Sequence, residues 1–292
     1  MHYDQGAFYR PLFENQMYQL QVAKGCSHNA CKFCDMYHQK YSLSSKEEIL
    51  EDILEIQDSG HDFDRIFLTG GNAFSIPHSL AVWVLETIHQ KLGSSVSIGC
   101  FARITDIAQK TDAEIRELLA LGVDDISIGT ESGMDEALQH MNKGFSSADI
   151  ISQCHRLDNV GMTYNLFYLL GMAGKGKWQE AANKTAEVYD QTKPKRIMLH
   201  TMTPFPDTPL WDEIQQGVFE PADEKEVLKE LREFISQTHM QTYILGAHYG
   251  NVVRLNGSVP ENKGKFVEAL DEAILKADEK KLKHYRSMMK SI

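Results

Sequence analysis

The sequence predicts an α/β fold, a partial (β/α)6 TIM-like barrel with a C-terminal helical extension. Strand-like and helix-like segments alternate through residues 18–210, a pattern typical of parallel strands covered by helices. The alternation provides six strands, which are too few for a closed eight-stranded barrel. After Pro204 the pattern changes to proline-punctuated loops and charged helical segments, which predict the extension.

The strands are predicted from short apolar runs that end at glycine or polar residues. Runs of this length without alternation are typical of strands buried on both faces. The second run, for example, closes at the paired glycines Gly70 and Gly71. The six predicted strands occupy residues 18–23, 65–69, 96–101, 125–129, 162–170 and 196–201.

Two capping boxes mark helix starts between these strands. Ser45 precedes Glu48 and Thr111 precedes Glu114, each at the spacing that satisfies the free N–H groups of a first helical turn. Gly122 is placed to end the second of these helices. Further helices are expected over residues 78–92, 148–159, 178–191, 224–240 and 261–290.

The predicted domain organisation has three parts. Residues 1–17 form an N-terminal segment, residues 18–210 the partial barrel, and residues 211–292 the extension. We expect the extension to pack on the barrel, because no linker composition separates the two.

The composition is that of an acidic globular protein. The 292 residues contain 30 Lys and Arg against 41 Asp and Glu, a formal net charge of −11. This balance makes nucleic acid an unlikely main partner, because phosphate binding depends on an excess of basic residues. No apolar run reaches the ~18 residues of a membrane helix, and no secretion signal opens the chain. We therefore expect a cytoplasmic protein without paired disulfides.

Three of the five cysteines, Cys26, Cys31 and Cys34, lie within nine residues after the first predicted strand. Loops at this end of a parallel strand carry the chemistry of βα folds. Three thiolates can hold three corners of an iron–sulfur cube and leave one iron open. Zinc is the alternative, with His28 or His38 as fourth ligand. The isolated Cys100 and Cys154 are expected to be small buried side chains.

The Cys-x4-Cys-x2-Cys pattern, with Phe33 before its last cysteine, resembles the radical S-adenosylmethionine (SAM) superfamily. The usual spacing there is Cys-x3-Cys-x2-Cys, so this loop has one extra residue. The resemblance points to a branch related to the Elongator-like, methylthiotransferase and oxygen-independent coproporphyrinogen oxidase groups, largely without assigned substrates. It implies a [4Fe–4S] cluster on the three cysteines that binds SAM and, after one-electron reduction, cleaves it to methionine and a 5′-deoxyadenosyl radical.

Later motifs extend the resemblance over residues 18–255 and imply the SAM contacts. Gly70-Gly71-Asn72 resembles the Gly-Gly-Glu motif, whose backbone binds the SAM amino group. A polar residue at Glu131 and a cation at Lys143 would suit the zwitterionic methionyl end. The glycine-rich segment after the fifth strand would lie against the adenine. The SAM-binding residues implied are Gly70, Gly71, Asn72, Glu131, Ser132, Lys143, Gly171 and Met172.

The substrate side is less defined by the sequence. Polar residues near strand ends or in the glycine-punctuated segment after residue 245 are candidates for acting on a substrate. They are His200, His248, Asn251, Arg103 and Arg254. A hydrogen-bonded structural role is the alternative for each of them.

Three functions remain open from the sequence. The first is a radical SAM enzyme acting on a small molecule or peptide, and the second is an RNA-modifying enzyme of the same superfamily. The third is a zinc-stabilised binding protein without catalysis. For an enzyme, reduced flavodoxin or ferredoxin is the expected electron donor, docking on a basic C-terminal helix. Its cations are Lys276, Lys280, Lys281, Lys283, Arg286 and Lys290, although a solvated helix face is the usual explanation of such a pattern.

Overall fold

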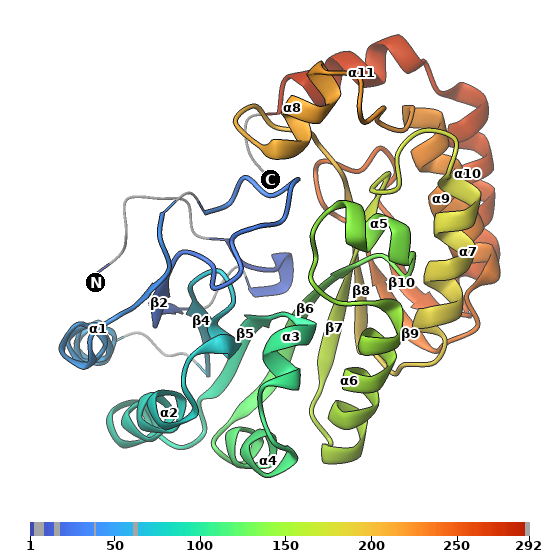
Figure 1. Ribbon diagram of the computed structural model, residues 1–292. Coiled ribbons are helices and arrows are strands. Elements are labelled where there is room, and N and C mark those ends of the chain that lie inside the picture. The colour runs from blue at the N-terminus through green and yellow to red at the C-terminus, as the bar shows by residue number, and fades with distance from the viewer. Residues whose placement is uncertain (3–8, 15–17, 38, 61–63, 290–292) are drawn as a thin grey trace. The chain divides into compact units, whose positions relative to one another are not determined.

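In the computed structural model of this protein, the main sheet consists mostly of parallel strands, with helices between them along the chain (Figure 1). The structure describes residues 1–2, 9–14, 18–37, 39–60 and 64–289. The chain divides into two units. Unit 1 comprises residues 1–29, 36–129 and 156–164, and unit 2 comprises residues 30–35, 130–155 and 165–292. The cysteine loop contributes to both, because Cys26 belongs to unit 1 and Cys31 and Cys34 belong to unit 2.

The strands of unit 1 are parallel neighbours. β1 pairs with β4, β4 with β5, and β5 with β6, so that Leu20 lies opposite Leu68 and Phe67 opposite Gly99. The strands are β1 (Tyr18–Gln21), β4 (Arg65–Thr69), β5 (Ser97–Ala102) and β6 (Val123–Glu131), which ends in unit 2. The helices are α1 (Lys46–Asp58), α2 (His78–Leu92), α3 (Ile104–Ala108) and α4 (Asp112–Ala120), with the short 3-10 turns η1 (Leu12–Glu14) and η2 (Ala73–Ser75).

A two-stranded ribbon closes the cysteine loop at its base. β2 (Ala23–Lys24) pairs antiparallel with β3 (Ser42–Leu43), so the chain enters and leaves the loop side by side. The sequence did not predict this ribbon, because two-residue strands carry no periodicity.

Unit 2 continues the same architecture. β7 and β8 are parallel, β8 and β9 are parallel, and β9 and β10 are antiparallel. The strands are β7 (Tyr164–Leu170), β8 (Arg196–Thr201), β9 (Thr242–Leu245) and β10 (Asn256–Val259). The helices are α5 (Asp135–His140), α6 (Ser147–Val160), α7 (Trp178–Tyr189), α8 (Pro209–Gln215), α9 (Glu224–Gln237), α10 (Lys263–Lys276) and α11 (Glu279–Ser287).

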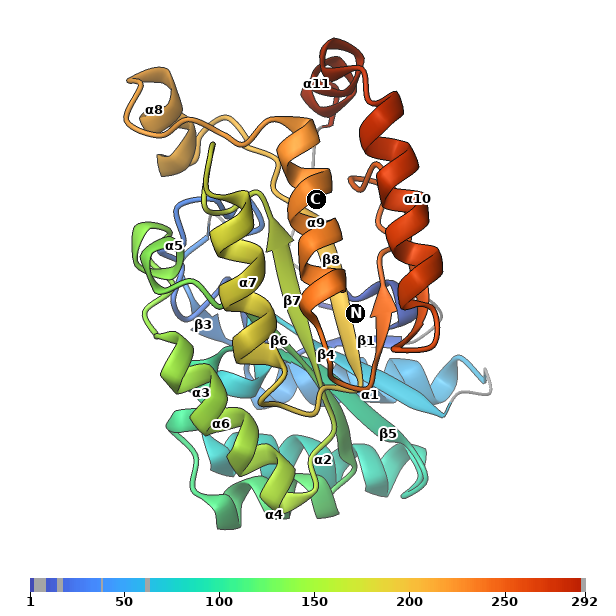
Figure 2. The same ribbon diagram turned by 90° about the vertical axis from the view of Figure 1, so that its right-hand side faces the viewer.

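Helix α9 is the centre of the helical layer of unit 2. It lies between α7 and α10, on one face of the strands (Figures 1 and 2). Its apolar residues Val227, Leu231 and Phe234 recur at helical spacing and are all buried. The ring of Phe234 meets the edge of the Tyr168 ring on β7, with centroids 4.7 Å apart. This packing fixes α9 against the strand that precedes the glycine-rich segment.

The predicted fold class is confirmed. All six predicted parallel strands are present as β1, β4, β5, β6, β7 and β8, and both capping boxes begin helices. Two features of the C-terminal part differ from the prediction. β9 and β10 add to the sheet, and the helix predicted over residues 261–290 is two helices, because Asp278 begins α11 by accepting from Lys281 N. The three-part domain division stays a prediction.

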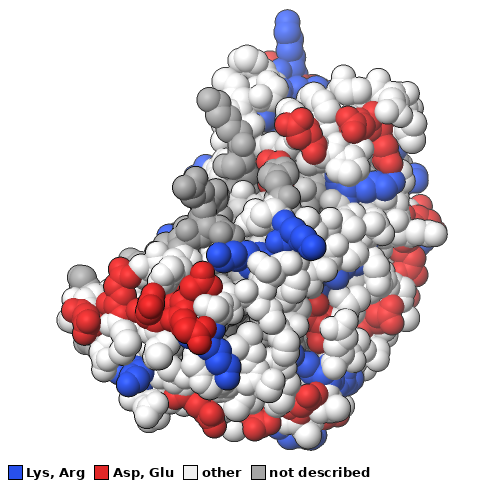
Figure 3. Space-filling model, turned by 60° about the vertical axis from the view of Figure 1, so that its left-hand side comes forward, with Lys and Arg blue, Asp and Glu red and all other residues white. Residues whose placement is uncertain are grey.

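One acidic surface of the protein lies on α1. Four exposed carboxylates lie along this helix: Glu47, Glu51, Glu55 and Asp58. Figure 3 shows this acidic face at the lower left of the view. None of the helices in the described part of the chain has both the length and the apolar character needed to cross a bilayer.

Candidate functional site

Cys26 lies against the paired glycines that follow β4. The Gly71 amide donates a hydrogen bond of 2.7 Å to the Gly25 carbonyl. A Cβ atom placed on Gly71 would lie only 2.5 Å from Cys26 Cβ, and one placed on Gly70 only 2.5 Å from the Ala23 carbonyl oxygen. Only glycine permits this approach of two backbones. The glycine pair therefore allows the segment that carries Cys26 to pack directly on the turn after β4.

Hydrogen bonds from Asn72 connect the same turn to the buried carboxylate of Asp106. Its Oδ1 accepts from Ser27 N at 3.0 Å, and its Nδ2 donates to Ser27 Oγ at 2.7 Å and to Asp106 Oδ2 at 2.8 Å. Asp106 also accepts from Arg103 N at 2.8 Å. Burial raises the pKa of Asp106, against the lowering effect of these hydrogen bonds. The side-chain amide of Asn72 thus holds Ser27, the residue after Cys26, while the backbone contact with SAM that the family resemblance implies for this motif stays a prediction.

Arg103 begins α3 in the same part of unit 1. It is buried, and its guanidinium donates to Thr105 Oγ1 at 2.9 Å. Its backbone and side chain thus support the turn that carries Asp106. Asp106 was missed from the sequence, because nothing distinguishes it locally from an ordinary helix-initiating acid.

Cys31 and Cys34 form a turn of their own in unit 2, with Cys34 N donating to Cys31 O at 3.2 Å. Lys32 anchors this turn on two sides. Its amide donates to Met141 O at 3.1 Å, and its carbonyl accepts from Leu210 N at 2.9 Å. Asn142, which has a left-handed φ of 56°, donates from Nδ2 to Ala30 O at 2.9 Å. The end of α5 and the start of α8 therefore hold the second half of the loop.

The five cysteines fall into two classes. All five lack a disulfide bond; Cys26, Cys31 and Cys34 are half-buried, whereas Cys100 and Cys154 are fully buried, as expected. Burial raises the pKa of Cys100 to about 12, so it stays a neutral thiol. Across the described residues, no three His, Cys, Asp or Glu side chains are arranged as ligands of one metal ion. His38, one of the alternative zinc ligands, lies outside the described residues, and His28 is half-exposed.

Lys143 and Glu131 are brought together after β6. Lys143 Nζ lies 3.4 Å from Glu131 Oε1, and the lysine is only 3% exposed. The ammonium group also lies 5.6 Å from the ring centres of both Phe33 and Phe145. Glu131 has a left-handed φ of 69°, which is costly for a residue with a Cβ and is concentrated at functional sites. The sequence indicated the cation and the carboxylate, but not the aromatic rings around them.

The glycine-rich segment after β7 is held by a buried acid. Glu230 on α9 accepts from Gly171 N at 3.1 Å through Oε2 and from Tyr168 Oη at 2.8 Å through Oε1. Burial raises the pKa of Glu230 to about 8. Met172 is buried, and Ser132 uses its hydroxyl to accept from Met134 N. Glu230 was missed, because in the sequence it is one more acid of a charged helix.

His200 and His248 meet at the end of β8. Their rings are stacked, with centroids 4.2 Å apart and an interplanar angle of 15°. Asn251 lies nearby but is fully engaged: it accepts from Thr201 Oγ1 at 3.0 Å and donates to Leu199 O and Gly246 O at 2.7 and 3.1 Å. Asn251 therefore fixes the loop that carries His248 against β8.

Comparison with solved structures gives the fold. The chain is similar to the radical SAM methyltransferase TsrM from Kitasatospora setae, with cobalamin and a [4Fe–4S] cluster bound (TM-score 0.56, 16% identity, 69% of this chain and 37% of that one). It is also similar to Elp3 from Methanocaldococcus infernus (TM-score 0.53, 17% identity, 88% and 62%). The third is methylornithine synthase, PylB (TM-score 0.54, 16% identity, 76% and 63%). The chain thus spans less than two thirds of each of these structures.

Comparison by sequence gives the family. No curated protein matches the chain. The sequence model of the radical SAM superfamily, however, matches residues 20–188, which is more than half of the chain and includes the three clustered cysteines. The chain therefore belongs to the radical SAM superfamily.

Proposed function

We propose that this protein is a radical SAM enzyme that holds a [4Fe–4S] cluster on Cys26, Cys31 and Cys34 and acts on a small molecule or a peptide. The observation that carries the proposal is one loop with three half-buried cysteines that form no disulfide, in a chain of this family. Three thiolates are the donor set for a cluster with one iron left open, so the residues present fit this group.

The chain's own residues prepare the two halves of this loop. Gly71 and Asn72 seat Cys26, and Met141 and Asn142 hold the turn of Cys31 and Cys34. The cluster, when bound and reduced, supplies the electron that cleaves SAM to methionine and a 5′-deoxyadenosyl radical, which abstracts a hydrogen atom from the substrate. The protein's contribution is to position the groups and exclude water.

For SAM we propose a binding site built on Lys143, Glu131 and the segment Gly171–Met172. A carboxylate beside an ammonium group matches a ligand that carries both charges at its amino-acid end. The aromatic rings of Phe33 and Phe145 exclude water from Lys143, which strengthens its interaction with a carboxylate. Glu230 holds Gly171, and a Cβ atom placed on this glycine would lie 3.2 Å from Val227 Cγ2, so the missing side chain lets the segment pack closely on α9. The adenine contact proposed for this segment follows from the family resemblance.

The test is anaerobic reconstitution with iron and sulfide, followed by dithionite and SAM, with 5′-deoxyadenosine as the product measured. We expect a coloured protein that forms 5′-deoxyadenosine. A variant with Cys26, Cys31 and Cys34 replaced by Ala should lose both cluster and product, whereas Cys154→Ala should keep both. A colourless protein with one zinc and no sulfide, or full cluster loading in the triple variant, would overturn the proposal.

We further propose that reduced flavodoxin or ferredoxin docks on the exposed lysines of α10 and α11, while Arg286 is buried in its ion pair with Glu224. Several of these cations already have carboxylate neighbours, since Lys276 contacts Glu272 and Lys283 contacts Asp223 and Glu279. Lys290 lies outside the described residues. Charge reversal at Lys280 and Lys283 should slow cluster reduction by such a donor but not by dithionite. An unchanged rate with the protein donor would remove this proposal.

A further inference from the structure

Four aromatic rings contact one another in a row near the carboxyl end of β8 in unit 2. The edge of Phe167 meets His200 at a centroid distance of 5.2 Å, His200 stacks on His248 at 4.2 Å, and His248 contacts Tyr249 at 4.5 Å. Both histidines are half-buried, and Tyr249 is 40% exposed. In parallel α/β folds, ligands bind at the carboxyl ends of the strands. The row of rings therefore lies where a substrate is expected.

The nitrogen atoms of the two imidazoles are available for a ligand. His248 Nδ1 accepts from Gly250 N at 3.2 Å, so the proton of the neutral ring is on Nε2. Within the described part of the chain, neither His248 Nε2 nor the ring nitrogens of His200 have a hydrogen-bond partner. Burial lowers the pKa of His200 to about 3 and that of His248 to about 4. Near neutral pH, each ring is therefore uncharged and presents one N–H donor.

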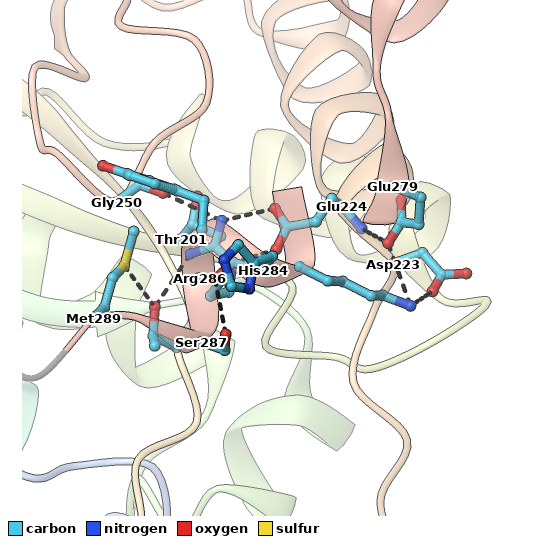
Figure 4. A network of polar contacts seen from close by, with 12 residues as sticks. Thr201, Asp223, Glu224, Gly250, Glu279, His284, Arg286, Ser287 and Met289 are labelled. Carbon is cyan, nitrogen blue, oxygen red and sulfur yellow. Dashed lines mark hydrogen bonds and ion pairs between the residues drawn. The ribbon is translucent and has the colours of Figure 1, made fainter. Parts of the chain in front are cut away.

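The loop that carries His248 is held in place by α11 (Figure 4). Arg286 forms a buried ion pair with Glu224. It also donates to Gly250 O at 3.2 Å and to Thr203 Oγ1 at 3.1 Å. Glu279, at the start of α11, accepts from Glu224 N at 2.9 Å. The position of His248 is thus fixed before any ligand binds, which lowers the entropic cost of binding.

Arg254 supplies a cation that the protein itself does not neutralise. Among the described arginines of unit 2, Arg286 pairs with Glu224, Arg232 with Asp271, and Arg196 donates to Asn165. Arg254 is exposed and has neither a hydrogen bond nor an ion pair in this described region. It lies close enough to His248 for its charge to lower the pKa of that imidazole.

We propose that His200, His248 and Arg254 form a subsite for an anionic oxygen group of the substrate, a carboxylate or a phosphate. This inference rests on the proposed function, because it assigns these residues to the substrate of that enzyme. Neutral imidazole N–H groups and a guanidinium fork are donors suited to such oxygens. The ring of Tyr249 extends the apolar wall beside them.

The subsite is tested by anion titration of the cluster-loaded protein, without SAM cleavage. Inorganic phosphate and acetate are added at constant ionic strength, and the imidazole resonances of His200 and His248 are followed by NMR. We expect saturable shifts of both resonances with phosphate or acetate, and the one that binds identifies the group. Arg254→Gln should weaken binding about tenfold, because a charge-assisted hydrogen bond is lost. His248→Phe keeps the ring stack and should also weaken binding.

The control is Arg232→Gln, which removes an arginine of the same unit that is already paired with Asp271. It should bind the anion like the unchanged protein. Absence of saturable shifts with both anions overturns the subsite, and so does equal affinity in Arg254→Gln and Arg232→Gln. Because the titration does not measure 5′-deoxyadenosine, its failure leaves the proposed function standing. Failure of SAM cleavage likewise leaves the binding result intact.

Discussion

Gly71 packs directly against Cys26, so closely that a Cβ atom on the glycine would lie 2.5 Å from the Cβ atom of the cysteine. The two residues come from different segments, the turn after β4 and the loop after β2. Their contact gives the paired glycines a role in this chain that does not depend on a bound ligand. The motif places the first thiol, and the contact with SAM that the family resemblance implies would be additional.

Replacing Gly71 by Ala should disrupt the cysteine loop. The added methyl group must displace Cys26, and overpacking of this kind costs about 1–3 kcal/mol of unfolding free energy. We expect lower iron and sulfide content after anaerobic reconstitution, measured per chain, together with a lower midpoint of urea unfolding. Gly264→Ala is the matched control, because no atom lies within 4 Å of a Cβ placed there. Equal cluster loading in the two variants would contradict the assigned role.

Replacing Lys143 by Met should weaken SAM binding. The methionine keeps an apolar chain between Phe33 and Phe145 but removes the cation. A hydrogen bond to a charged group is worth roughly 1.5–3 kcal/mol, so the affinity should fall about 10- to 100-fold. Equilibrium dialysis of the cluster-loaded protein with SAM measures this directly. Lys184→Met is the control, since Lys184 is exposed and pairs with Glu136 and Glu180. Equal SAM affinities in both variants would remove Lys143 from the site.

Local sequence patterns were enough to predict most of the strands and helices of the fold. The apolar run of residues 65–69 is β4 with the predicted bounds, and Ser45 and Thr111 begin their helices as capping boxes require. β10 was not predictable in this way, because its sequence Asn-Gly-Ser-Val has little strand propensity and depends on pairing with β9. The same limit explains the small ribbon at the base of the cysteine loop.

For the candidate site, the sequence spacing pointed to the three cysteines but not to the residues that position the surrounding loops. Three cysteines in nine residues are visible without a structure. Asp106 and Glu230 are not, because each becomes distinctive only through partners 34 and 59 residues away, Asn72 and Gly171. A buried acid in a helix full of acids has no local signature. Long-range hydrogen bonding of this kind is set by tertiary packing alone.

Glu230 should make the stability of the protein depend on pH. Burial raises its pKa to about 8 from an ordinary value of 4.5. A carboxyl group with a raised pKa stabilises the folded state fully below its unfolded pKa, and this contribution is lost as the pH rises through about 8. Glu230→Gln stays neutral and can still accept from Gly171 and donate to Tyr168. Its free energy of unfolding should therefore fall less than that of the unchanged protein between about pH 5 and about pH 9.

The measurement for Glu230 is urea unfolding at several pH values across that range. Glu233→Gln, on the same helix but half-exposed, is the control and should retain the pH dependence of the unchanged protein. If Glu230→Gln follows the same curve as Glu233→Gln, the carboxyl of Glu230 does not take up a proton on folding. An apolar replacement, Glu230→Leu, should be destabilised at every pH, because Gly171 N–H and Tyr168 Oη lose their partner.

The buried pair of Arg286 and Glu224 should couple α11 to α9 far more strongly than a surface pair. Arg286 and Glu224 are 11% and 5% exposed, whereas Arg232 and Asp271 are 36% and 50% exposed. Removing one partner of a buried pair typically costs 3–5 kcal/mol, because the other charge stays buried without compensation. Arg286→Leu should therefore lose about this much unfolding free energy, and Arg286→Leu with Glu224→Leu should recover part of it.

The exposed pair of Arg232 and Asp271 is the control. A double-mutant cycle on this pair, measured by urea unfolding, should give a coupling energy of about 0–1 kcal/mol. Similar coupling energies for the two pairs would show that α11 is not held by Arg286, and hydrogen exchange of residues 248–251 would then be unchanged in Arg286→Leu.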